Sequence, residues 1–382
     1  MINEDIIRLL DKINYDRNLT KNRYLNPVEV HKELARLSDV FKQEEIGKSV
    51  DGNAIRKIIW GSGSTRVMMW SQMHGNESTT TRALINLLFL IDDNPSYLND
   101  LYENLQLIII PIVNPDGALS YERFNANQVD LNRDAINLSQ PESKLLMNCF
   151  ESYQPDFCLN LHDQRSIYGV DNNFACLSFL APSYNKEQSI NPNREKSMSL
   201  IAETTGFLSN NGLKGNIGRY DETYNKNCFG DFFQNRGTPT ILVEAGQLQL
   251  DYNRDIAAYY STQGILFLLK SISNKDLTDK LVRKYYKIPM NEKVFTDLLI
   301  KNVKINNGFF HIAIMYEMKV YKSKLMYLLK VENILNGIKA SHRIIDADGY
   351  YLEGKTGNKI KQLAVGEYLS GLRVNSVNFS LF

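Results

Sequence analysis

The sequence predicts an α/β protein, with a largely buried sheet covered by helices and a smaller β-rich unit toward the C-terminus. Three observations predict this class. From about residue 54, short apolar runs rich in Val and Ile alternate with longer stretches of helical periodicity, which is typical of βαβ units. Each run ends in polar residues, as strands do at the ligand-binding edge of an open sheet. Near Ser271 the composition changes, and the remaining chain is rich in Lys and Tyr and is divided by turn signals.

The size and composition limit the class of protein. The chain has 382 residues, of which 43% are hydrophobic and 23% are charged, as expected of a soluble globular protein with one sizeable core and a smaller second unit. The longest apolar stretch, residues 83–91, is far shorter than the roughly 20 residues of a membrane span. A net charge of +1 argues against general nucleic-acid binding. We therefore expect neither a membrane nor a nucleic-acid partner.

Three segments are expected along the chain. Residues 1–50 are expected to form a helical segment packed on a main domain of residues 51–274, and residues 275–382 a small β-rich accessory domain. Asn26-Pro27 has the form of an N-cap followed by a first-turn proline. The apolar residues at helical spacing after it are Val30, Leu34, Leu37 and Phe41.

The N-terminus and the cysteines indicate the compartment. Residues 1–19 carry acidic side chains between their apolar residues, whereas a secretory signal needs a basic start and an unbroken apolar stretch. We predict a surface helix there. The four cysteines show no CxxC pairing and are expected to be reduced thiols, which favours a cytoplasmic location. They are Cys149, Cys158, Cys176 and Cys228.

The main domain contains four apolar runs that we predict as strands. These are residues 67–70, 107–113, 157–161 and 240–243. Two helical patterns have the length and amphipathicity to cover a face of the resulting sheet. One spans residues 254–269, and the other follows the first strand with Ala83, Leu84, Leu87, Leu88 and Ile91 on one stripe.

Residues 275–382 alternate between apolar and polar positions in short stretches such as 311–316 and 327–331. Turn signals separate the stretches, at Asn306-Asn307-Gly308, Asn336-Gly337, Asp348-Gly349 and Glu353-Gly354. The segment holds 18 Lys and Arg against 10 Asp and Glu, which predicts a solvated basic face or, alternatively, a surface for an acidic partner. Substrate gating and self-association are both open roles for this unit, and the oligomeric state is open as well.

A possible metal-binding pair follows the first strand run. His74 and Glu77 are three residues apart in Met73-His74-Gly75-Asn76-Glu77, and Gly75 permits a tight backbone between them. An imidazole and a carboxylate at the end of a strand can turn toward one point. Zinc accepts both ligand types, and a catalytic zinc site uses three protein ligands and leaves one position open.

Two further residues sit at strand ends in the same way. His162 follows the strand run 157–161 and is a good source of a third metal ligand. Glu244 follows the strand run 240–243. A carboxylate beside apolar residues is costly unless it is paired or functional, and a general base with a raised pKa would suit that setting.

Polar loops lie between these positions. Asn114-Pro115-Asp116-Gly117 forms a predicted turn, and residues 123–133 contain two arginines and several asparagines. Near a metal site, these residues indicate a negatively charged substrate, because a guanidinium pairs with a carboxylate in a bidentate fork. A second arginine could stabilise the oxyanion that forms when water attacks a carbonyl.

In this order, the motifs H-x-x-E, N-P-D-G, R-x-N-A-x-x-V-D-L-N-R, strand-His and strand-Glu resemble those of the zinc metallocarboxypeptidases, the carboxypeptidase A-like family. The resemblance covers roughly residues 55–270. It implies a mixed, mostly parallel central sheet flanked by helices. It also implies zinc-dependent hydrolysis of an amide bond next to a free carboxylate, with one Zn²⁺ ion as cofactor and a peptide as substrate.

The resemblance implies roles for individual residues. His74, Glu77 and His162 would hold the zinc ion. Glu244 would be the general base and acid, and Arg123 would polarise the scissile carbonyl. Asn132 and Arg133 would bind the terminal carboxylate of the substrate. Tyr220 is favoured over Tyr224 as the substrate-binding tyrosine that the family places before its catalytic glutamate.

The chain also departs from the family pattern. Asn76 occupies a position where digestive carboxypeptidases usually carry a basic residue, so one side of the substrate cleft is expected to differ. Asp134 follows Arg133 where an asparagine and an aromatic residue are more usual. The pocket for the substrate side chain is expected near Phe229.

Other functions remain open, among them a carboxypeptidase for peptidoglycan fragments or for acidic dipeptides. Aspartoacylases and succinylglutamate desuccinylases share an H-G-N-E opening and a D-L-N-R segment, and they act on N-acyl amino acids. The N-P-D-G and R-x-N-A segments favour the peptidases. A non-catalytic binding module on the same fold is a further alternative, and it would show itself by the loss of a ligand or of the base.

Overall fold

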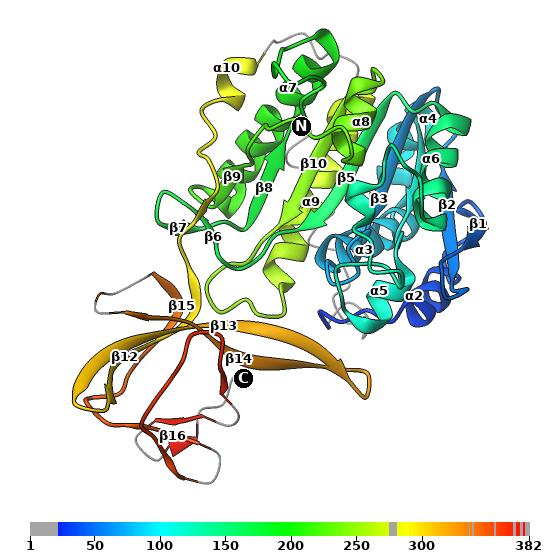
Figure 1. The fold of residues 1–382 in the computed structure, drawn as a ribbon. Helices are drawn as coiled ribbons and strands as arrows, with labels where there is room; N and C mark the ends of the chain where they lie inside the picture. Colours follow the sequence, from blue (N-terminus) through cyan, green and yellow to red (C-terminus); the bar gives the residue numbers. More distant parts are fainter. Residues whose placement is uncertain are drawn as a thin grey trace.

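We describe the protein from a computed structural model (Figure 1), which covers residues 22–274, 281–335, 337, 340–354, 357–369, 372–374 and 377–378. Residues 22–274 form one α/β region, and residues 281–288 pack into its core through Tyr285 and Ile288. The described residues that follow, up to residue 378, form a C-terminal unit with its own core. The surface helix predicted within residues 1–19 lies outside the described residues. No described helix is long and apolar enough to cross a bilayer.

The α/β region is built on an eight-stranded mixed sheet in the order β1-β2-β4-β3-β5-β10-β8-β9. Its centre, β4-β3-β5-β10, is parallel throughout, which confirms the predicted mixed and mostly parallel sheet. The strands are β1 (Lys42–Lys48), β2 (Ala54–Trp60), β3 (Thr65–Ser71), β4 (Leu105–Ile110), β5 (Phe157–Asp163), β8 (Leu177–Leu180), β9 (Ile217–Arg219) and β10 (Thr240–Ala245).

Helices cover both faces of this sheet. In β3, Val67 and Met69 point into one core cluster with α3 (Thr79–Asp93), α7 (Pro192–Leu208) and α9 (Asp255–Ser273). Met68 and Trp70 alternate with them and point into a second cluster with α6 (Pro141–Tyr153) and α8 (Phe229–Asn235). The remaining helices are short: α2 (Pro27–Leu34), α4 (Asn99–Asn104), α5 (Pro115–Ser120) and α10 (Val282–Tyr285).

Most predicted elements are present, with corrected ends. The run 107–113 is a strand only to Ile110, because Pro111 has no amide hydrogen for the sheet. The Asn26 side chain caps α2 at Val28 N, but this helix ends at Leu34. The helical character expected of residues 1–50 does not extend to β1, which pairs with β2. All four cysteines are free.

The C-terminal unit is a small β structure, as predicted. Its five-stranded sheet has the order β15-β12-β13-β14-β18 and packs on a four-stranded sheet, β17-β16-β19-β20, around a shared core. The principal strands are β12 (Thr296–Ile305), β13 (Gly308–Tyr321), β14 (Lys324–Leu335) and β15 (Ser341–Asp346). The Asn306-Asn307-Gly308 turn joins β12 to β13, whereas Asn336 lies outside the described residues.

The C-terminal unit is fastened to the α/β region by a strand. β11 (Glu292–Lys293) pairs with β6 (Tyr168–Val170), which also pairs with β7 (Asn173–Phe174). Beyond this junction, the long hairpin β13–β14 runs along one end of the α/β region (Figure 1).

Candidate active site

The carboxyl ends of three neighbouring parallel strands bring the predicted site together. β3 leads into the loop with His74 and Glu77, and Glu77 lies just before α3. His162 is the second-to-last residue of β5, and it pairs in register with Glu244 on β10. Because parallel strands end at the same edge of a sheet, residues distant in the chain meet there.

The loop between β3 and α3 is shaped by its contact with α5. A Cβ atom at Gly75 would lie 1.9 Å from the carbonyl carbon of Gly117, so only glycine fits at this position. Asn114 holds both sides of the contact: its Oδ1 accepts from Gly117 N at 2.8 Å, and its Nδ2 donates to the Met73 carbonyl at 3.2 Å. The N-P-D-G motif therefore supports the loop that carries His74.

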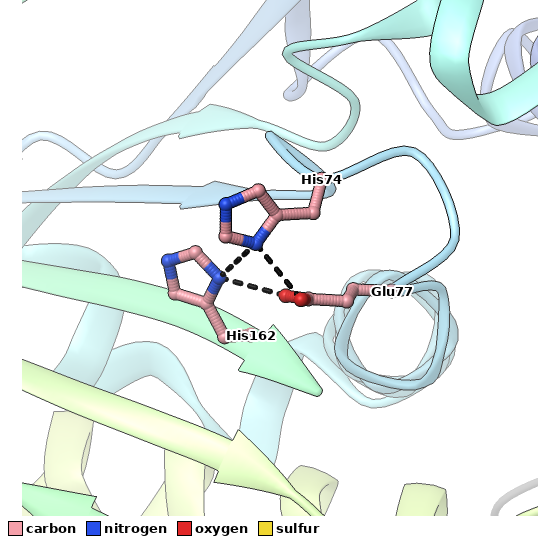
Figure 2. A group of neighbouring side chains, drawn as sticks. All are labelled: His74, Glu77 and His162. Atoms are coloured by element: carbon pink, nitrogen blue, oxygen red, sulfur yellow. Dashed lines mark hydrogen bonds and ion pairs between the residues drawn. The ribbon is translucent and has the colours of Figure 1, made fainter. Parts of the chain in front are cut away.

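The three predicted ligands point at one another (Figure 2). Their candidate ligand atoms all lie within 4.8 Å of one another. His162 Nδ1 is 3.2 Å from His74 Nδ1 and 2.7 Å from Glu77 Oε2, and His74 Nδ1 is 2.8 Å from Glu77 Oε1. Two imidazole nitrogens and one carboxylate are a usual ligand set for catalytic zinc, so the residues present fit this ion.

Asp130 supports this cluster, and the sequence reasoning gave it no role. Its Oδ1 lies 3.1 Å from His74 Nε2, on the side of the ring that faces away from His162. Metal-binding histidines usually donate their second nitrogen to such an acceptor, which leaves the first nitrogen free to bind. His162 Nε2, by contrast, is buried without a partner among the described residues. In the sequence, the indication of this role is the position of Asp130 in the segment V-D-L-N-R, which also contains Asn132 and Arg133.

The electrostatics of the cluster suit a cation. Burial raises the pKa of the Glu77 carboxyl, but the two histidines outweigh burial and hold it well below its usual value. Burial lowers the pKa of His74, yet Glu77 and Asp130 raise it overall. Burial also lowers the pKa of His162, and this effect outweighs the nearby charge of Glu77, so that the pKa lies below its usual value. An ionised Glu77 and a neutral His162 are the forms in which both bind metal.

Glu244 has the surroundings of a proton acceptor. Burial raises its pKa well above the usual value, and the nearby carboxylates of Glu77 and Asp163 raise it further. Burial likewise raises the pKa of Tyr220, with Glu244 as the next cause, whereas the charge that acts on Tyr224 is Asp231. The charge of Glu244 thus acts on Tyr220 and not on Tyr224, and it acts also on Tyr168, whose ring centroid lies 5.4 Å from that of Tyr220.

Arg123 lies next to the cluster. Its Nη1 is 3.3 Å from Glu77 Oε1, and its Nε and Nη2 donate to Asp130 Oδ2 at 3.1 and 3.0 Å. Two of its contacts are thus to one carboxylate oxygen, which fixes the guanidinium beside the candidate metal ligands while it stays 40% exposed.

Asn132 and Arg133 lie in a short 3-10 turn, Leu131–Arg133, which contacts the start of α8. The Asn132 side chain accepts from Phe229 N at 3.1 Å, and Arg133 Nη1 is 3.0 Å from Cys228 Sγ. Phe229 itself is fully buried in the second core cluster. The Arg133 guanidinium is exposed and is therefore available to a ligand. The backbone N–H of Asn132 donates to Asp130 Oδ1 at 3.0 Å, which connects Asn132 to the metal-site cluster.

The comparisons with known proteins agree with this geometry. Residues 28–206 match the model of the zinc carboxypeptidase family, whereas Tyr220 and Glu244 lie beyond the matched residues. Carboxypeptidase SOL1 of Arabidopsis thaliana is 29% identical over 210 residues, 46% of this chain and 41% of that protein. Carboxypeptidase 2 of Trichophyton tonsurans is 28% identical over 129 residues, 32% of this chain and 24% of that protein. The chain thus spans about a quarter of the length of this relative.

Solved structures share the fold. The carboxypeptidase A of Helicoverpa armigera superposes with a TM-score of 0.52 at 18% identity, over 72% of this chain and 80% of that chain. A metallo-carboxypeptidase from Burkholderia cenocepacia gives a TM-score of 0.51 at 16% identity, over 65% of this chain and 68% of that chain.

Proposed function

We propose that the chain is a zinc metallocarboxypeptidase-like hydrolase that removes the C-terminal residue of a peptide, a proposal supported by its similarity to carboxypeptidases in sequence and in fold. The scissile amide bond lies next to the free carboxylate of that residue. The observation that carries the proposal is the meeting of His74, Glu77 and His162 at one sheet edge, with Glu244 in register beside His162.

Each residue near the cluster has a task in this reaction. A bound Zn²⁺ ion would polarise the scissile carbonyl and lower the pKa of the attacking water. Glu244 takes a proton from that water and later delivers it to the leaving amine. Arg123 donates hydrogen bonds to the oxyanion, and Asp130 holds Arg123 in place for this.

The terminal carboxylate of the substrate is bound at the part of the site that lies next to α8. Arg133 forms an ion pair with the terminal carboxylate, and Asn132 donates to it through its side-chain nitrogen, Nδ2. Tyr220 contributes to binding beside Glu244. Together these groups distinguish a free carboxyl terminus from a blocked one.

Metal analysis paired with a substrate screen tests the proposal. We expect one zinc ion per chain, loss of hydrolysis on chelation and recovery with added zinc. Peptides with a free carboxyl terminus should be cleaved much faster than the same peptides with an amidated terminus. Hydrolysis of N-acyl amino acids alone would favour the acylase alternative. A zinc-loaded protein that cleaves neither class would contradict the proposal.

A further inference from the structure

A small cavity adjoins the candidate metal site and is built by both parts of the chain. It has a volume of about 190 Å³ and is bounded by Glu77 and Arg123 on one side. Met315, Tyr316 and Met318 of β13 form another side. None of Asn132, Arg133 and Tyr220 lines this cavity. The cavity is therefore separate from the residues that we assign to the terminal carboxylate.

The C-terminal unit is held firmly at this wall. Asn291 Nδ2 donates to Gln164 Oε1 at 2.7 Å, and His342 Nε2 lies 2.9 Å from the Ser166 carbonyl. Gln164 and Ser166 both line the cavity. The ring of Tyr316 packs against Tyr252 of the α/β region, with 5.5 Å between ring centroids. The β13 side chains are thus a fixed wall of the cavity.

The lining carries an excess of positive charge. Four arginines line the cavity with two carboxylates, Glu77 and Asp163. Glu77 faces the two histidines, and Asp163 accepts from Thr79 N and pairs with Arg254 at 3.5 Å. The arginines are Arg23, Arg123, Arg165 and Arg254.

Two of these arginines lack a full set of partners. Arg165 is exposed, and no hydrogen bond or ion pair of its guanidinium is found among the described residues. Arg23 is buried, and its Nε has no partner in the described part of the chain. On the C-terminal unit, Asp297 is engaged with β13, since its Oδ2 accepts from Tyr316 N at 2.7 Å. Asn76 Oδ1, also on the cavity wall, is buried without a described partner.

We propose that this cavity binds a carboxylate on the acyl side of the scissile bond. The β13 wall limits the number of substrate residues on that side. The inference rests on the proposed function and adds a substrate class to it. The group bound is either an acidic residue that precedes the C-terminal residue or a dicarboxylic acyl chain. Arg165 pairs with its carboxylate, and Met315 and Met318 block further residues.

The charge preference is tested with matched substrates. We expect the zinc-loaded protein to cleave N-acetyl-Glu-X with a kcat/KM about tenfold or more above that for N-acetyl-Gln-X, where X is the same residue. In Arg165→Gln this ratio should fall to near one, and Arg165→Lys should keep part of it. Arg236→Gln removes an exposed arginine outside the cavity and should leave the ratio unchanged. A wild-type ratio near one would overturn the proposal.

Binding without turnover separates this proposal from the function on which it rests. In calorimetric titrations, N-acetylglutamate should bind the zinc-loaded protein more tightly than N-acetylglutamine, and Arg165→Gln should remove the difference. Equal binding overturns the proposal even if peptides are hydrolysed. Unequal binding without hydrolysis of any substrate keeps the acidic site and rejects the peptidase. An N-succinyl amino acid, assayed beside N-acetyl-Glu-X, distinguishes the two sources of the carboxylate.

The wall is tested by its length selectivity. Met318→Ala widens the cavity, so the kcat/KM for a pentapeptide ending in Glu-X should rise severalfold relative to that for N-acetyl-Glu-X. Met326→Ala on β14 shortens an exposed methionine of the same hairpin that does not line the cavity, and it serves as the control. Equal handling of short and long substrates by the wild type would show that β13 does not limit length.

Discussion

At the scale of single residues, the site depends on which groups hold the ligands as much as on the ligands themselves. Asp130 contacts His74 and Arg123 through different carboxylate oxygens. One side chain thus orients both a candidate ligand and the candidate oxyanion donor.

Replacing Asp130 with Asn should weaken zinc binding by roughly 10- to 100-fold, because an amide is a poorer acceptor for His74 Nε2. Competition with a metal chelator measures the change. Asp221→Asn alters an exposed carboxylate elsewhere and should leave zinc affinity at the wild-type value. An Asp130→Asn protein with unchanged affinity would show that the contact does not orient His74.

Replacing Glu244 with Gln keeps the shape of the side chain and removes its ability to accept a proton. Turnover should fall by roughly two orders of magnitude or more, while zinc content stays unchanged. Steady-state kinetics with metal analysis of the same sample measures both quantities. Near-normal turnover in this variant would mean that another group is the base.

Arg133→Ala should weaken hydrolysis of substrates with a free carboxyl terminus far more than that of blocked ones, because the ion pair is lost only with the former. The ratio of kcat/KM for a peptide and its amidated form measures this. Equal losses on both substrates would remove Arg133 from the carboxylate site.

The sequence motifs predicted which residues meet, but not all of their partners. H-x-x-E, His162 and Glu244 follow strand runs, so their convergence could be inferred from the direction of parallel strands. Asp130 and Arg165 could not be assigned in this way, because a polar loop leaves the direction of a side chain open until tertiary contacts decide it.

At the scale of elements, the buried strands were predicted well and the edge strands poorly. β3, β5 and β10 are covered on both faces, and each therefore contains a nearly continuous apolar run. β1 has the sequence KQEEIGK and lies at the sheet edge, so it carries no apolar signal. β13 is much longer than the alternating stretch 311–316, because its distal half pairs with β14 beyond the core.

Asp231 in helix α8 should make the stability of the protein depend on pH. Burial raises the pKa of Asp231 to about 7. The folded protein therefore keeps a proton that the unfolded chain, with an ordinary pKa of about 3.9, releases. The resulting stabilisation is complete below pH of about 4 and is lost as the pH rises through about 7.

Asp231→Asn should remove this dependence. Relative to the wild type, the variant should gain roughly 2–3 kcal/mol in the free energy of unfolding between pH 5 and pH 8. Urea denaturation at the two pH values measures the gain. The same difference at both values would mean that Asp231 does not retain its proton on folding.

At the scale of the whole molecule, the C-terminal unit is joined to the α/β region by contacts as well as by the chain. The β11–β6 pairing, the Asn291–Gln164 hydrogen bond and the His342 contact with Ser166 all cross between them. The composition change near Ser271 predicted a second unit. It did not predict this attachment, because such cross-contacts depend on the relative placement of two folded parts.

We expect the two parts to unfold in a single calorimetric transition, because each contributes to the stability of the other. Asn291→Ala removes the hydrogen bonds to Gln164 and to Ser178 and should lower the transition temperature or separate two transitions. Two well-separated transitions in the wild type would show that the contacts between the parts are weak.

The order of residues along the chain has a consequence for synthesis. His74, His162 and Glu244 leave the ribosome before β13 and His342 are made. The chemistry of the site is thus encoded ahead of the wall that restricts it. If the β13 wall limits substrate length as proposed, an early stop after α9 would remove that limit together with the contacts that the C-terminal unit makes to the α/β region.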